Sequence, residues 1–161
     1  MASSKKPTYN EIQFDSPEER EFYWWCEEAI DIGVIWSYEY HPEPIELSLP
    51  VKVGKRSLLR SHSYTPDYIL YAEGTIEPFY PKTGLIYVDV KGGFSLYNNH
   101  REFSINQKWI YQKHGTYINK VVPEKFFKKM WVPEKARLTE KTQKVRKKYE
   151  ECRTVEEFRN G

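Results

Sequence analysis

The chain has 161 residues, of which 39% are hydrophobic and 30% are charged, and its formal net charge is +2 at pH 7. This length suits one domain with its own core, and no apolar run is long enough to cross a membrane. The first residues lack the apolar segment of a secretory signal, so we expect a cytoplasmic protein with no membrane partner. The two cysteines, Cys26 and Cys152, form no CxxC pair, which argues against a zinc site and a disulfide framework.

The small net charge conceals a basic segment near the C-terminal end. Residues 120–148 contain eleven Lys or Arg against three Glu, a charge of +8, which leaves −6 for the rest of the chain. A basic segment on an otherwise acidic protein favours a polyanionic partner such as DNA, although a solvated helix face would carry the same charges. The candidates for phosphate contacts in this segment are Lys128, Lys129, Arg137, Lys144, Arg146 and Lys147.

We expect residues 1–13 to form a flexible arm that precedes the first helix. Ser16 is suited to cap this helix, because Pro17 fits its first position and Glu19 follows the cap by three residues, as in a capping box. Apolar residues at the spacing of one buried helical face come next: Phe22, Cys26, Ala29 and Ile30. Gly33 is expected to end the helix in a left-handed turn.

Two stretches of alternating polarity, 36–40 and 44–53, predict strands, and Pro50 is compatible only with an edge strand or a bulge. The loop that follows contains Arg60 and leads to His62. Both residues are candidates for contact with a phosphate of DNA. A solvated loop explains Arg60 equally well, and a hydrogen bond within a turn explains His62 slightly better.

Two short apolar runs follow, and each contains one acidic residue, Asp67 in the first and Asp89 in the second. Residues i and i+2 of a strand lie on the same face, so Lys91 is expected beside Asp89. Gly92 and Gly93 would then end the strand. A carboxylate pair can hold Mg²⁺ through oxygen ligands, and a nearby Lys can orient or deprotonate a water. The pattern predicts a metal-dependent site for phosphodiester hydrolysis, although an ordinary surface ion pair on a hairpin would leave the same pattern.

The rest of the chain predicts a long loop between the two acidic strands and then further helices and strands. These are a helix from Asn98 or Asn99 to His114, a strand at 116–122, a short helix at 124–130, a basic helix at 133–149 and a last turn at 154–158. The order of elements predicts an α/β fold with a mixed sheet flanked by helices. We expect the main domain at 14–133 and a basic helical extension at 134–161.

Pro66-Asp67 and Asp89-Val90-Lys91, separated by a spacer, resemble the PD-(D/E)XK nuclease superfamily. Longer stretches are similar to the phage endonuclease I family of Holliday-junction-resolving enzymes, namely 33–40, 62–70, 112–115 and 119–123. The resemblance implies a restriction-endonuclease-like sheet in which Asp67, Asp89 and the Val90 carbonyl hold one or two Mg²⁺ ions, for which Mn²⁺ can substitute. It also implies that Lys91 acts on the attacking water.

The same resemblance implies that Glu19 is a third metal-binding carboxylate, whereas the helix pattern alone needs it only for capping. Glu18 takes this role if the register differs by one residue. Two departures from the family stand out. The family has Glu where this chain has Asp89, and here the loop between the two acidic strands is longer, while 51–61 resembles an inserted hairpin or loop.

The function implied by the resemblance is a Mg²⁺-dependent, structure-selective endonuclease that acts on branched DNA, such as four-way junctions. The family works as a homodimer, which could exchange a strand near 44–53, and a phage-encoded enzyme would act in the bacterial cytoplasm. Two alternatives stay open: a restriction-like or transposon-end nuclease of different specificity, and an inactive DNA-binding module. The complete set of three acids and Lys91 argues against the inactive module.

Overall fold

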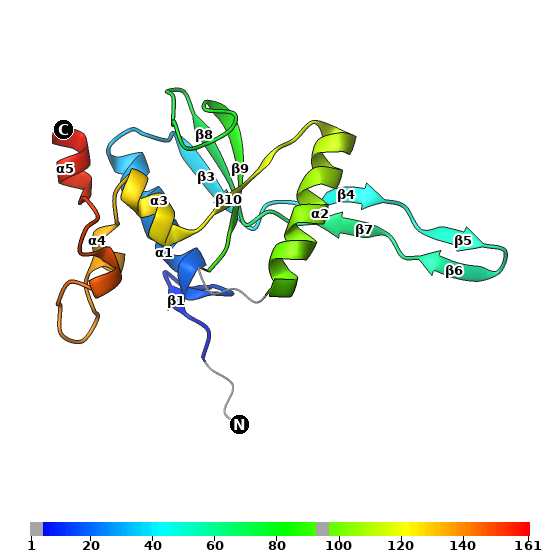
Figure 1. Ribbon diagram of the computed structural model, residues 1–161, viewed down its shortest axis with the longest axis horizontal. Coiled ribbons are helices and arrows are strands. Elements are labelled where there is room, and N and C mark those ends of the chain that lie inside the picture. Colours follow the sequence, from blue (N-terminus) through cyan, green and yellow to red (C-terminus); the bar gives the residue numbers. More distant parts are fainter. Residues whose placement is uncertain (1–4, 93–96) are drawn as a thin grey trace.

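The computed structural model describes residues 5–92 and 97–161, and its centre is a four-stranded sheet. The strands follow the spatial order β10-β9-β8-β3. Their bounds are β3 Ser37–Tyr40, β8 Tyr68–Ala72, β9 Gly84–Val90 and β10 Ile118–Val121. The β9–β10 pair is parallel and the other two pairs are antiparallel. The expected α/β class with a mixed sheet is therefore confirmed (Figure 1).

Helices cover both faces of this sheet (Figure 1). One face packs on α1 (Pro17–Asp31) and α3 (Pro123–Lys129), because Ile86 and Val88 of β9 share a buried cluster with side chains of both helices. The other face packs on α2 (Tyr97–His114), through a second cluster that Tyr87 contacts. Alternate residues of β9 thus point to opposite layers, as strand geometry requires.

The first helix begins and ends where the sequence predicts. The Ser16 hydroxyl accepts a hydrogen bond from the Glu19 amide at 3.2 Å, and Gly33 has a φ of +80° just after the helix. The buried face is wider than the expected single stripe, because Tyr23, Trp24 and Trp25 are also buried. Ile30 was expected in the core and is 38% exposed. The Tyr9 ring contacts Tyr23 and Trp24, and Trp25 packs on the rings of Phe126 and Trp131, which explains the wider burial.

A two-stranded arm extends from the body of the molecule (Figure 1). It consists of β4 (Ile45–Ser48) paired with β7 (His62–Tyr64) and, further out, β5 (Val51–Val53) paired with β6 (Arg56–Leu59). Pro50 separates β4 from β5, since proline has no N–H for the ladder. The single strand expected at 44–53 is therefore two strands, and the inserted hairpin expected at 51–61 is present.

The N-terminal segment is a hairpin rather than the expected flexible arm. Residues 8–13 contain β1 (Thr8–Tyr9) paired with β2 (Ile12–Gln13). The Tyr9 ring makes edge contacts with the rings of Tyr23 and Trp24 on α1. These aromatic contacts hold the hairpin on the helix and account for the difference from the prediction.

The long basic helix expected at 133–149 does not form. The segment contains α4 (Glu134–Arg137), a bridge between Leu138 and Val145, and a 3-10 turn, η1 (Lys147–Tyr149). The fold turns back because the Tyr149 hydroxyl donates a hydrogen bond to buried Glu21 of α1. This long-range contact competes with local helix propensity. A last helix, α5 (Val155–Asn160), follows near the expected place.

The remaining predicted elements follow the second acidic strand, and part of them lies outside the described residues. The helix expected to end at His114 is α2, but the side chains of 97–100, and with them the cap expected at Asn98 or Asn99, lie outside the described residues. Gly93 also lies outside them. The strand expected at 116–122 and the helix expected at 124–130 correspond to β10 and α3.

Within the described part of the chain, no helix combines the length and apolarity needed to cross a membrane.

Candidate active site

The two strand acids meet because β8 and β9 are antiparallel neighbours. Tyr68 pairs with Val88, so extending this register by one residue places Asp67 opposite Asp89. The Val90 amide donates a hydrogen bond of 2.7 Å to Asp67 Oδ2. This bond fixes the Asp67 side chain against the end of β9. The sequence predicted an acid in each strand. Asp89 lies in β9, Asp67 immediately precedes β8, and the strand pairing brings the two together.

Asp89 and Lys91 lie on the same side of β9, as the strand pattern predicts. The Lys91 ammonium is 2.9 Å from Asp89 Oδ2 and 5.5 Å from the centre of the Phe103 ring on α2. Asp89 is only 3% exposed. Its Oδ2 atom has no partner with hydrogen-bond geometry in the described part of the chain, in spite of the nearby ammonium. This buried carboxylate oxygen is therefore paired with one cation, the Lys91 ammonium.

Glu19 reaches this region from the first turn of α1. It is 7% exposed, and the Tyr40 hydroxyl donates a hydrogen bond of 2.7 Å to its Oε2 atom. The Tyr68 hydroxyl donates a second bond, also 2.7 Å, to the Glu19 backbone carbonyl. Glu19 therefore contributes its backbone amide to the Ser16 cap, while its carboxylate is a buried acid near the strand pair. The alternative, Glu18, lies beside Gly92, where its Oε1 would be 3.2 Å from an added Cβ.

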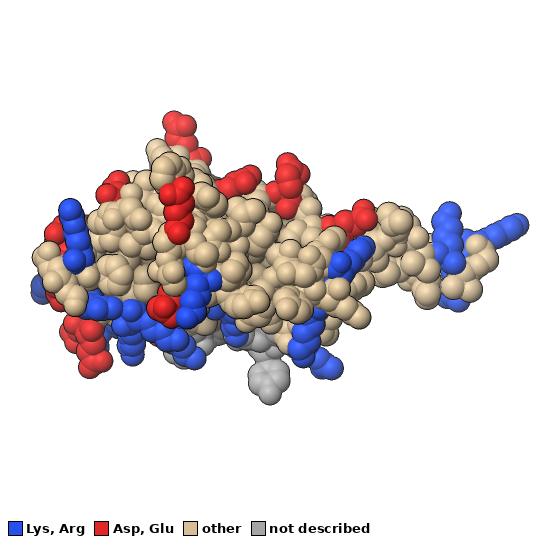
Figure 2. Space-filling view, turned by 90° about the horizontal axis from the view of Figure 1, so that it is seen from above, with Lys and Arg blue, Asp and Glu red and all other residues tan. Residues whose placement is uncertain are grey.

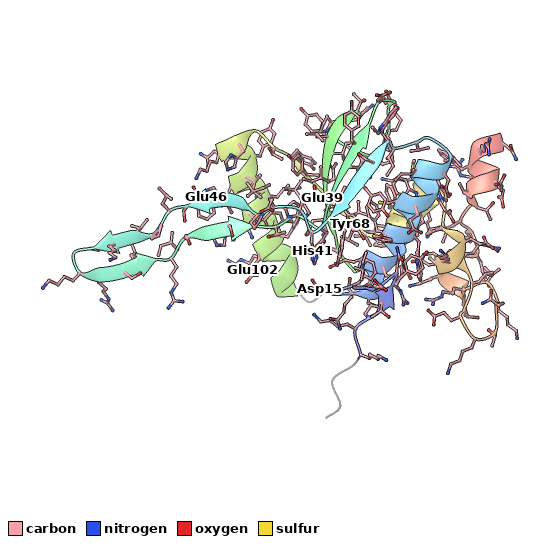
Figure 3. The ribbon with its side chains drawn as sticks, turned by 180° about the vertical axis from the view of Figure 1, so that it is seen from behind. Asp15, Glu39, His41, Glu46, Tyr68 and Glu102 are labelled. Atoms are coloured by element: carbon pink, nitrogen blue, oxygen red, sulfur yellow. The ribbon has the colours of Figure 1, made fainter. Side chains whose placement is uncertain are left out.

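Two residues that the sequence did not single out extend this acidic region. His41 Nε2 lies 3.7 Å from Glu19 Oε2 and 3.6 Å from Asp15 Oδ2. One ligand atom from each of these three residues lies within 4.8 Å of the other two. In Figure 3, His41 and Asp15 point toward each other below Tyr68. No sequence signal joins them, because Asp15 precedes α1 and His41 follows β3.

The pKa values of the acidic residues at the site are raised, because these carboxyl groups lie close together and are largely shielded from water. Burial, followed by the negative charges of Asp89 and Glu19, raises the pKa of Asp67 to about 9. Burial also raises the pKa of Glu19, although its hydrogen bond from Tyr40 acts in the opposite direction. Like charges at close range disfavour joint ionisation, so the cluster favours a proton or another cation in its midst.

Tyr64 is a further side chain at this cluster that the sequence analysis did not find. Its hydroxyl is buried without a hydrogen-bond partner in the described residues. Burial and the charge of Asp89 raise the pKa of the Tyr64 hydroxyl. Tyr64 ends β7, so it links the arm to the acidic residues. Alternating strand positions could have suggested this orientation, but only with the pairing of the arm known.

The predicted donors have the chemistry of a site for a hard divalent cation, since Asp67, Asp89 and Glu19 offer carboxylate oxygens that are buried or half-buried. Among the described residues, however, the group whose ligand atoms lie within 4.8 Å of one another is Asp15, Glu19 and His41, which contains only one of the three predicted carboxylates. Magnesium prefers oxygen ligands of this type. The Val90 carbonyl, which follows Asp89 in β9, is the backbone oxygen that could complete the set.

The predicted phosphate-binding residues do not form one helix face. Arg60 is exposed on the arm, and Lys128 and Lys129 are exposed at the end of α3. Lys144 and Lys147 are exposed in the C-terminal segment. Figure 2 shows Lys and Arg side chains at the tip of the arm and along one side of the body.

Three of the candidates are engaged within the protein. Arg137 pairs with Glu134, with 2.6 Å between Nη2 and Oε1, and Arg146 Nη1 lies 3.8 Å from Glu21 Oε1. His62 Nε2 lies 3.2 Å from Asn106 Oδ1, and its ring stacks on Trp109. The expected hydrogen bond of His62 within a turn is therefore wrong, because His62 connects the arm to α2. These contacts give all three residues a structural role.

Comparison of the chain with protein-family models, with curated proteins and with solved structures found no significant match.

Proposed function

We propose that this protein is a Mg²⁺-dependent DNA endonuclease of the PD-(D/E)XK type with a restriction-endonuclease-like fold. The proposal is supported above all by one arrangement: Asp67, immediately before β8, lies opposite Asp89 on the paired strand β9, with the Lys91 ammonium 2.9 Å from Asp89. Glu19 adds a buried acid from α1. A surface ion pair on a hairpin explains this poorly, because Asp89 is 3% exposed.

Each residue has a defined task in this proposal. Asp67, Asp89, Glu19 and the Val90 carbonyl would hold one or two Mg²⁺ ions, or Mn²⁺ in their place. A bound ion of this kind lowers the pKa of a coordinated water and neutralises charge on the scissile phosphate. Lys91 holds the attacking water in line with the phosphorus. The water oxygen forms the new P–O bond as the bond to the leaving sugar oxygen breaks.

The proposed substrate is branched DNA, such as a four-way junction, cut by a homodimer. A junction needs two symmetric cuts, which two copies related by a two-fold axis can supply. The arm supports a dimer, because it exposes large apolar side chains away from the body of the protein: Leu49, Val51, Val53, Leu58 and Leu59. Such a surface is costly to leave in water. Basic residues including Arg60, Lys128, Lys129, Lys144 and Lys147 would then contact phosphates without reading bases.

The test compares cleavage of a labelled four-way junction with cleavage of a linear duplex of the same sequence, in Mg²⁺ and in EDTA. Paired cuts near the branch, absent in EDTA and in Asp67→Asn, are the expected result. Equal cutting of both substrates would indicate a restriction-like or transposon-end specificity instead. Tight binding without cleavage in Mg²⁺ or Mn²⁺ would refute the enzymatic proposal and leave a DNA-binding module.

A further inference from the structure

A groove runs along the outer edge of the sheet, beside β10. Its first part, of about 620 Å³, is lined by Tyr80, Gln107, Lys108, Tyr111, Gln112 and Tyr117. Its second part, of about 340 Å³, shares Tyr117 with the first and is lined in addition by Lys120, Lys125 and Lys129. We call the two parts together the β10 groove. Tyr117 lines both parts, so the two parts adjoin at this residue.

The charge of the β10 groove differs from that of the protein as a whole. Its described lining contains four lysines, three in the second part and Lys108 in the first, and neither Asp nor Glu. The whole chain has 25 basic and 23 acidic residues. A lining with only one sign of charge favours an anionic ligand.

Aromatic rings form the walls of the first part. Tyr80, Tyr111 and Tyr117 are 59%, 50% and 37% exposed, so each keeps part of its ring open to solvent. The Tyr117 ring stands nearly perpendicular to both others, at ring-centre distances of 5.5 Å to Tyr80 and 6.5 Å to Tyr111. Exposed rings beside lysines are the combination on which unpaired bases stack while their phosphates contact the cations.

The tyrosine wall is held in place by a buried side chain. Asn119 is 6% exposed, and its amide exchanges two hydrogen bonds with the Tyr80 backbone, of 2.9 Å and 2.8 Å. A third bond, of 2.9 Å, goes to the Tyr87 carbonyl. From α2, Gln107 donates a bond of 2.7 Å to the Ile118 carbonyl on the edge strand. The loop, the edge strand and α2 are thus connected, which makes the groove a preformed surface.

The β10 groove begins next to the candidate active site. Lys120 pairs in register with Asp89 on the neighbouring strand, and the Lys91 amide donates a hydrogen bond of 2.8 Å to the Val121 carbonyl. Paired residues of parallel strands point to the same side of a sheet, so Lys120 shares the side of Asp89 and Lys91. Burial, followed by the positive charges of Lys125 and Lys91, lowers the pKa of Lys120.

The geometry points to the β10 groove as a binding site for a single-stranded segment of DNA that leaves the cleavage site. The inference rests on the proposed function, because it specifies the substrate as branched DNA with unpaired nucleotides beside the scissile bond. Duplex DNA fits the groove less well, since paired bases do not expose their faces to tyrosine rings. The lysines near Asp89 would hold the first phosphates, and the tyrosines would stack on the following bases.

The test measures binding of a fluorescein-labelled oligothymidine of about 12 nucleotides, a length within the usual range of such sites, by fluorescence anisotropy. The full-length protein is used in EDTA, so that cleavage does not interfere. Tyr111→Ala and Tyr117→Ala are expected to weaken binding by about fivefold or more, the usual effect of losing one stacking partner. Tyr111→Phe keeps the ring and should bind like the wild type. Tyr71→Ala, on β8 and 38% exposed, is the matched control and should also leave binding unchanged.

The contribution of the lysines is measured from the salt dependence of the same binding. Lys120→Ala and Lys125→Ala should each reduce the slope of log Kd against log salt by about 0.7, the value for one phosphate contact on a single strand. Lys141→Ala, an exposed residue outside the groove, should leave the slope unchanged. Thermal unfolding of every variant separates loss of binding from loss of folding.

Three results would overturn the inference. The first is that the wild type does not bind oligothymidine, and the second is that both Tyr→Ala variants bind it as tightly as the wild type. The third is that groove variants change the self-association of the protein in sedimentation, which would assign the groove to a second copy. The outcome is separable from that of the proposed function. Asp67→Asn should stop cleavage and keep oligothymidine binding, whereas a wild type that binds in the expected pattern but cuts no DNA would refute only the nuclease.

Discussion

Asp67→Asn tests whether burial and the neighbouring carboxylates disfavour the ionised form of Asp67 in the folded protein. Burial and the charges of Asp89 and Glu19 raise the pKa of Asp67 from 3.8 to about 9. Because the folded-state pKa lies above the unfolded one, the folded protein binds more protons in this range. The stabilising contribution of the protonated form is therefore complete below about pH 4 and is lost as the pH rises toward about 9.

The size of the effect follows from the same pKa values. Each pKa unit corresponds to about 1.4 kcal/mol. The free energy of unfolding that the protein loses between pH 4 and pH 7 because of Asp67 is therefore about 4 kcal/mol at most. Asp67 retains some contact with solvent, and screening reduces this to about 2 kcal/mol. Asn has the same shape, and its amide oxygen can accept the Val90 hydrogen bond. Asp67→Asn is therefore expected to raise the free energy of unfolding at pH 7 by about 2 kcal/mol.

Urea denaturation in EDTA, from pH 5 to pH 8, measures this directly. The wild type should lose stability across the range, and Asp67→Asn should lose less. Asp31→Asn, at the exposed end of α1, is the matched control and should follow the wild type. Adding Mg²⁺ should stabilise the wild type more than Asp67→Asn, since ligand binding stabilises only a folded state that binds it. Parallel curves for the wild type and Asp67→Asn would refute the reasoning.

Three further substitutions test other parts of the structure. Lys91→Ala should lower the single-turnover rate of junction cleavage by about a hundredfold or more. The affinity for the junction, measured in Ca²⁺, should stay nearly unchanged, and equal losses of rate and affinity would contradict a catalytic role. Tyr149→Phe removes a hydrogen bond to buried Glu21 and should lower the free energy of unfolding by about 1–3 kcal/mol, with faster proteolysis of the C-terminal segment than in a Lys147→Ala control. Gly33→Ala, at a φ of +80°, should lower the melting temperature with a cost of about 1 kcal/mol, and an unchanged melting temperature would argue against the left-handed turn.

Local signals in the sequence predicted the elements that depend on near neighbours. Ser16 marks the start of α1 and Gly33 follows its end. Both could be predicted because capping and a left-handed turn involve only a few adjacent residues. The same holds for Asp89 and Lys91, whose shared side of β9 follows from the period of a strand. These features needed no knowledge of the rest of the fold.

Contacts between distant segments explain what the sequence did not predict. Tyr149 and Glu21 are 128 positions apart, and their hydrogen bond accompanies the break of a segment whose composition favours a helix. Tyr9 packs on α1 in the same long-range manner and orders the N-terminal hairpin. His41 approaches Asp15 and Glu19 only because β3 returns alongside α1. Such pairs leave no periodic trace in one sequence.

The acids of the candidate site are positioned by packing that does not involve their charges. Asp67 precedes β8, whose Tyr68 and Leu70 are fully buried, and Glu19 precedes the fully buried Phe22 on α1. The apolar layer between these elements therefore holds the carboxylates close together at an electrostatic cost. A cation at the site would relieve this cost, so binding and stability are coupled through the same residues. A binding module without catalysis has no need of this arrangement, which is why the buried acids favour a nuclease over an inactive DNA-binding module.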